Sequence, residues 1–144
     1  MVALLIYFRP LSFPDLSFEA DSDAFTVQKT DVWYDDKGDF QLDHTYYSIQ
    51  FGSPEAAAIQ EILDRYSYRR SVRALFEGVH LLDIATGYWL HLWGPNIDFE
   101  SSGTGMIEMN RKTYCMDRSG NKKNLAFMEE ISSVLAEIEP IETS

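Results

Sequence analysis

The sequence predicts an α+β fold, in which an antiparallel β-sheet built from hairpins is covered by two amphipathic α-helices. Three observations lead to this prediction. Strand-like runs are joined by short turns rich in Asp, Asn and Gly, which favours hairpins. Two segments, about 53–73 and 121–138, carry apolar residues at helical spacing. Alternating β–α–β units, which indicate a parallel sheet, are absent.

The first third of the chain has the pattern of strands. Residues 2–8 form a continuous apolar run, typical of a strand buried on both faces. A hairpin follows, in which Val32–Tyr34 and Phe40–Leu42 flank the turn sequence 35–39. Asp favours the opening of a type I turn, and Gly38 can adopt the left-handed conformation that closes the turn with a bulge.

The first helix is predicted over about 53–73. Ser53 can cap the free backbone N–H groups, and Pro54 suits the first helical position. Glu61 and Arg65 are four residues apart, in the order that favours an ion pair on a helix surface. These features place the start of the helix more firmly than its end.

Two further hairpins and a second helix are predicted after this helix. The glycine-rich stretch Ser101–Gly105 is followed by strand-like sequence, so we expect a flexible loop rather than a phosphate-binding loop. The second helix spans about 121–138 and ends before Pro140. The hairpins consist of the strand-like runs 79–84 with 88–93 and 104–110 with 112–116.

The composition predicts one domain, 1–144, in the cytoplasm. A chain of 144 residues with 45% hydrophobic residues can bury a core without disulfides, and it contains no repeat or linker. Cys115 is the sole cysteine, so no intramolecular disulfide forms and a reducing compartment is expected. The apolar run 2–8 is too short to span a bilayer and lacks the basic start of a signal peptide.

We expect no metal ion, no cofactor and no enzyme activity. His44, His80 and His91 are far apart in the sequence and match no metal-binding spacing. The aspartates of the turn 35–39 lack the spacing of a calcium loop. Cys115 lies in an apolar run, where a cysteine behaves as a small hydrophobic residue.

The net charge of −11 excludes some classes of partner. The chain holds 23 acidic and 12 basic residues, so it repels nucleic acid and anionic lipid over most of its surface. Arg65, Arg69 and Arg73 would form a basic face on the first helix, which we expect to be solvated. The charge therefore predicts no nucleic-acid or membrane partner, and a basic protein is the partner that it favours.

The negative charge is concentrated around the hairpin near the amino terminus. Residues 1–43 hold nine acids and three bases, a net charge of −6. Acidic groups accelerate encounter with a basic partner, and aromatic rings supply buried contact area. This pattern favours a small acidic inhibitor, such as the immunity partner of a bacterial toxin. Asp35, Asp36, Asp39 and Asp43 would supply steering and ion pairs, while Trp33 and Tyr34 would supply contact area.

Two other functions fit the same sequence. One is a small-molecule-binding or catalytic domain with a pocket between sheet and helices, lined by His91, Trp89, Trp93 or Tyr114. The other is a subunit that associates with itself as a homodimer. The aromatic residues alone do not distinguish these functions, because rings serve cores and interfaces equally well.

Overall fold

A computed structural model describes residues 11–16, 24–70, 87–116 and 122–143. Within these ranges the strands form one seven-stranded sheet with the order β6-β5-β4-β3-β1-β2-β7, and every neighbouring pair is antiparallel. The predicted α+β fold with an antiparallel sheet is thus confirmed. The elements are β1 (Ala24–Tyr34), β2 (Phe40–Gln50), α2 (Pro54–Arg65), β3 (Gly87–Trp93), β4 (Asp98–Ser101), β5 (Met106–Met109), β6 (Lys112–Cys115), α4 (Lys122–Leu135) and β7 (Glu142–Thr143).

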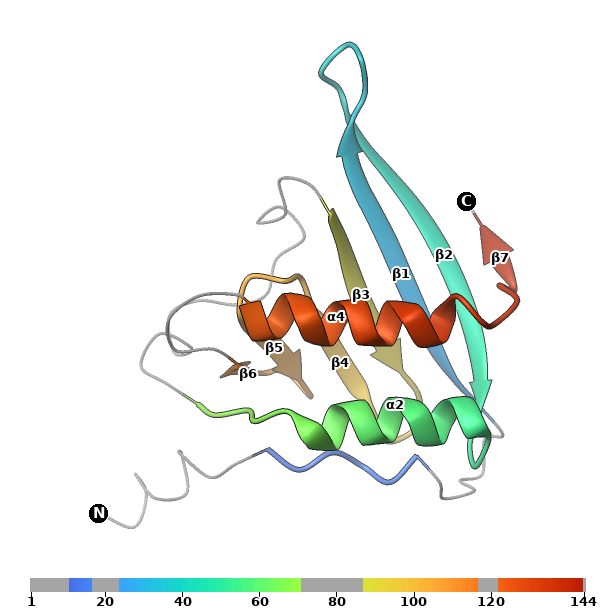
Figure 1. The fold of residues 1–144 in the computed structure, drawn as a ribbon, viewed down its shortest axis with the longest axis vertical. Helices are drawn as coiled ribbons and strands as arrows, with labels where there is room; N and C mark the ends of the chain where they lie inside the picture. Colours follow the sequence, from blue (N-terminus) through green and yellow to red (C-terminus); the bar gives the residue numbers. More distant parts are fainter. Residues whose placement is uncertain (1–10, 17–23, 71–86, 117–121, 144) are drawn as a thin grey trace.

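Helices α2 and α4 lie side by side across the same face of the sheet (Figure 1). The core fills the space between them and the strands, and the inward residues of β3 alternate with outward ones as expected for a strand covered on one side. Leu90 and Leu92 point into this core, so Trp89, His91 and Trp93 lie on the face of the sheet opposite the helices. The fully buried core side chains include Phe25, Val27, Leu90, Leu92, Phe99, Ile107, Phe127 and Ile131.

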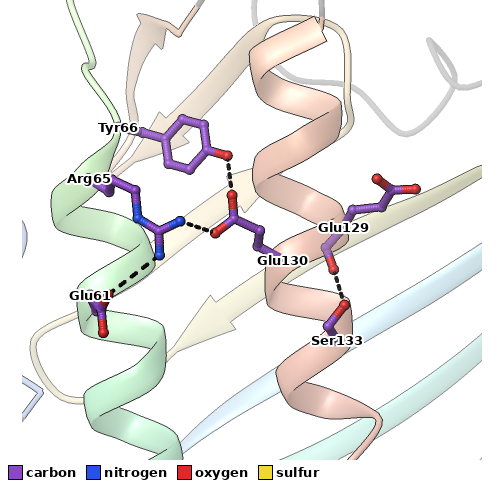
Figure 2. A network of polar contacts seen from close by, with 6 residues as sticks. All are labelled: Glu61, Arg65, Tyr66, Glu129, Glu130 and Ser133. Atoms are coloured by element: carbon purple, nitrogen blue, oxygen red, sulfur yellow. Dashed lines mark hydrogen bonds and ion pairs between the residues drawn. The ribbon is translucent and has the colours of Figure 1, made fainter.

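The two helices are also joined by a polar network (Figure 2). Glu130 of α4 accepts hydrogen bonds from Arg65 Nη1 and from the Tyr66 hydroxyl, each at 2.6 Å. The predicted pair of Glu61 and Arg65 is present, with 3.7 Å between the charged atoms. Since Arg65 is half exposed, this network contributes less to stability than the buried core does.

Helix α2 begins as predicted but ends earlier. Ser53 Oγ accepts the N–H group of Ala56 at 3.1 Å, which is the expected cap. The helix was expected to reach about residue 73, yet it ends at Arg65, and Tyr66 has an extended backbone with ψ 155°. Beyond it, Tyr68 is buried in the core, which a continuing helix would not place there.

Arg69 is therefore not on a helix, and the predicted basic face of Arg65, Arg69 and Arg73 does not form as expected. Arg69 exchanges two backbone hydrogen bonds with Cys115, Arg69 N to Cys115 O at 3.0 Å and Cys115 N to Arg69 O at 2.8 Å. This pairing with the end of β6 overrides the helical pattern, because a tertiary contact outweighs local propensity. Arg73 lies outside the described residues.

The other predicted elements agree with the structure where it describes them. Helix α4 covers most of 121–138, and the β5–β6 hairpin turns at Asn110 and Arg111, with φ of 48° and 62°. Strand β4 was not predicted. The expected strands 2–8 and 79–84 lie outside the described residues. No helix in the described part of the chain is long and apolar enough to cross a membrane.

Candidate functional site

The β1–β2 hairpin extends beyond both helices and ends in the predicted turn (Figure 1). Its strands pair without interruption from Ala24 with Gln50 to Tyr34 with Phe40. The N–H group of Gly38 donates to the carbonyl of Asp35 at 2.9 Å, and Gly38 has φ +83°. This geometry confirms the type I turn closed by a left-handed glycine.

Three aromatic side chains are exposed at this hairpin end, which we define as Trp33–Phe40 together with Asp43. The exposed fractions are 38% for Trp33, 53% for Tyr34 and 37% for Phe40. The rings of Tyr34 and Phe40 meet edge to face at 5.6 Å on one face of the ribbon, while Trp33 lies on the other. They account for three of the five exposed large hydrophobic residues in the described chain, so these rings are surface residues rather than core.

Asp35 has a structural role in the turn. One carboxylate oxygen accepts the N–H groups of Lys37 and Asp39, both at 2.9 Å, and the other accepts Gln41 Nε2 at 2.9 Å. The hydrogen bond from Asp39 contributes most to lowering the pKa of Asp35, because it stabilises the ionised form. Asp35 therefore shapes the hairpin end in addition to its expected contribution to the charge.

The other three predicted aspartates are exposed and take no part in the turn. Within the described residues, the carboxylates of Asp36, Asp39 and Asp43 form no hydrogen bond or ion pair. Asp43 lies directly opposite Asp31 on the neighbouring strand, and Lys29 forms its ion pair with Asp31, at 3.3 Å, while its ammonium group lies over the ring of Tyr88. Like charges directly opposite each other destabilise a sheet. These charges therefore do not support the fold.

A second cluster lies on the face of the sheet opposite the helices. Trp89, His91 and Trp93 follow one another along β3, with ring centroids 5.5 Å and 4.7 Å apart. The ring of Tyr46 from β2 meets that of Trp93 at 6.2 Å. His44 lies on the same face, where its Nδ1 is 2.8 Å from Thr30 Oγ1 and 3.0 Å from Gln28 Nε2. These contacts give His44 a structural role.

Carboxylates from β4 complete this cluster at His91. The Nε2 atom of His91 lies 2.9 Å from Asp98 Oδ1 and 3.7 Å from Glu100 Oε1. Burial raises the pKa of Glu100 above its ordinary value, the charge of His91 lowers it, and the charges of Glu108 and Asp98 raise it further. His80, the third histidine, lies outside the described residues.

The residues expected to line a pocket do not meet in one. Trp89, His91 and Trp93 lie on the face opposite the helices, whereas Tyr114 is 8% exposed on the face that the helices cover. The glycine-rich stretch Ser101–Gly105 also differs from the expected flexible loop. Asn124 of α4 accepts the N–H group of Gly105 at 2.9 Å and donates to Ser101 Oγ at 2.8 Å, which anchors this stretch.

The sequence patterns did not predict two parts of these surfaces. Phe40 was assigned to a strand but not to the contact surface, although its position directly after the turn indicates the same exposure as Tyr34. Asp98 and Glu100 were missed because β4 was missed. The alternation of acidic residues around Phe99 was the signal that could have revealed this strand.

The function of the chain has to be inferred from this geometry. Comparison with models of protein families, with curated proteins and with solved structures finds no significant match.

Proposed function

We propose that this protein binds a basic protein through the hairpin end, and that it acts as an inhibitor of the immunity type, which neutralises a basic toxin in the cytoplasm. The observation behind this proposal is the exposure of Trp33, Tyr34 and Phe40 around a turn rich in carboxylates. Aromatic rings are enriched among the residues that dominate binding energy, and carboxylates accelerate encounter with a basic partner.

The energetics of the hairpin end support a role in binding rather than in folding. Asp36, Asp39 and Asp43 contribute charge without contributing contacts within the described chain. The uninterrupted pairing of β1 and β2 holds these groups on a regular two-stranded ribbon, which lowers the entropy lost when a partner binds. Lys37 is the only basic residue of the hairpin end, so the net charge of the hairpin end is negative.

The first step of the test is to look for a basic, toxin-like protein encoded in a neighbouring reading frame and to produce it as an inactive variant. We expect tight binding and an association rate constant that falls as salt increases. Replacing both Asp36 and Asp39 by Lys should slow association by about tenfold or more at low ionic strength. Trp33→Ala together with Tyr34→Ala should instead accelerate dissociation, because contact area is lost.

A matched control changes the same amount of charge elsewhere. Glu137 and Glu139 lie just beyond α4, and replacing both by Lys alters the net charge as much as the change at Asp36 and Asp39 does. If both double variants slow association with the partner equally, the binding surface is not the hairpin end. Asp35 is left unchanged in these variants, since its carboxylate holds the turn.

Light scattering separates this proposal from self-association. A monomer at micromolar concentration leaves the hairpin end open to a partner. A dimer that dissociates in the variant with Trp33→Ala and Tyr34→Ala would show that the aromatic surface binds a second copy, and this result would overturn the proposal.

A further inference from the structure

Three potential metal ligands meet across β3 and β4 on the face of the sheet opposite the helices. His91 pairs with Glu100 in the register of these strands, and Asp98 pairs with Trp93, so all three side chains lie on one face. One ligand atom from each of His91, Asp98 and Glu100 lies within 4.8 Å of the other two. The side chains are 22%, 52% and 29% exposed, so an ion from solvent can reach them.

The spacing of these atoms fits a first-row transition metal. Zinc binds His nitrogen and carboxylate oxygen at about 2.0–2.2 Å, which places neighbouring ligand atoms of a tetrahedral site about 3.3–3.6 Å apart. The distances from His91 Nε2 are 2.9 Å to Asp98 Oδ1 and 3.7 Å to Glu100 Oε1. These values lie on either side of that range, and all three ligand atoms lie within 4.8 Å of one another, so binding an ion would require the two carboxylates to adjust around His91.

The local charge also favours a cation. Glu108 of β5 lies directly opposite Glu100 on the same face, which brings three carboxylates together around one imidazole. A hydrogen bond between His91 and Asp98 alone would compensate the negative charge of only one of these three carboxylates. A divalent ion would reduce the repulsion among the carboxylates. The rings of Trp89 and Trp93 flank His91 and limit its contact with water.

We propose that His91, Asp98 and Glu100 bind a divalent transition-metal ion of the zinc class. An imidazole with two carboxylates suits zinc, and also cobalt or nickel at the same ligands. The three protein ligands leave a coordination position open to water, as in zinc sites that are not purely structural. This site is separate from the hairpin end, and the proposal does not depend on the function inferred for that surface.

Calorimetric titration of the full chain with zinc chloride tests the proposal. We expect one ion per chain and a loss of affinity of more than about tenfold in each of His91→Ala, Asp98→Asn and Glu100→Gln. His44→Ala is the matched control, because it removes an imidazole from the same face of the sheet outside the cluster and should leave the affinity unchanged. Circular dichroism confirms that each variant is folded.

Cobalt provides a second measurement that locates the ion. Cobalt quenches indole fluorescence only at short range, so bound cobalt should quench Trp89 and Trp93 and leave Trp33 unaffected. The quenching should persist in Trp33→Phe and be lost in His91→Ala. Millimolar binding only, or equal zinc affinity in wild type, His91→Ala and Glu100→Gln, would overturn the proposal.

Discussion

Replacing Asp43 by Asn should make the protein more stable. Asp43 and Asp31 are directly opposite each other in the β1–β2 ladder, where Cβ atoms are about 4.5–5.5 Å apart. Both carboxylates are partly or fully exposed, so the dielectric constant near that of water applies to their repulsion. Lys29 partly balances Asp31 and does not contact Asp43.

The size of the effect follows from Coulomb's law. Two unit charges about 6 Å apart repel each other by about 0.7 kcal/mol in water without salt. Screening reduces this to about 0.3 kcal/mol at physiological ionic strength and to about 0.6 kcal/mol at 0.01 M. We therefore expect Asp43→Asn to raise the free energy of unfolding by these amounts, with the larger gain at low salt.

Urea denaturation at both ionic strengths measures this gain. A double-mutant cycle with Asp31→Asn isolates the repulsion, because Asp43→Asn should have little effect once the opposite charge is removed. Asp36→Asn removes an equal charge that faces no carboxylate across the strands and serves as the control. If Asp43→Asn lowers the stability, or its effect is independent of both salt and Asp31, the proposed repulsion is wrong.

Other contacts give predictions of known sign. Asn124→Ala removes the acceptor of the buried Gly105 N–H group and should cost about 1–3 kcal/mol in urea denaturation. Tyr66→Phe removes the hydrogen bond to Glu130 and should cost about 1 kcal/mol in the same assay. Burial and this hydrogen bond raise the pKa of Tyr66 from 10.0 to about 12. The stability that neutral Tyr66 contributes is therefore complete below pH 10 and is lost as pH rises towards 12. The free energy of unfolding should decline less over this range in the Phe variant, which has no hydroxyl to ionise. Because the pKa of Asp35 is lowered, its carboxylate stabilises the turn fully above pH 3.8, and this stabilisation is lost as pH falls further. The NMR signals of the Lys37 and Asp39 amides should therefore shift together with a midpoint below pH 3.8.

The parts of the fold that depend on neighbouring residues were predictable from the sequence. The turn at Gly38 requires a left-handed residue, and the cap at Ser53 requires a side-chain oxygen, so both are visible in the local pattern. The end of α2 is set differently. It depends on the pairing of Arg69 with Cys115, which is distant in the sequence. Strand β4 was missed because it has four residues and only Phe99 marks its apolar side clearly.

The same distinction applies to the candidate surfaces. The position of Trp33 on a strand was predictable, but its exposure depends on how far the hairpin extends beyond the helices. The cluster at His91 depends on the register between β3 and β4, since a shift of one residue would move Asp98 and Glu100 to the other face. No spacing along the chain encodes that register, so a search for sequence motifs cannot find this cluster.

The two surfaces can be tested independently because they use different structural supports. The hairpin end is held by the local turn and by the pairing of β1 with β2. The cluster at His91 is held by the pairing of β3 with β4 and by the rings beside it. Charges at Asp36 and Asp39 should therefore change partner association without changing zinc affinity, and substitutions at His91 should do the reverse. A variant of either surface that altered both measurements would show that the surfaces are coupled through β1, which pairs with both β2 and β3.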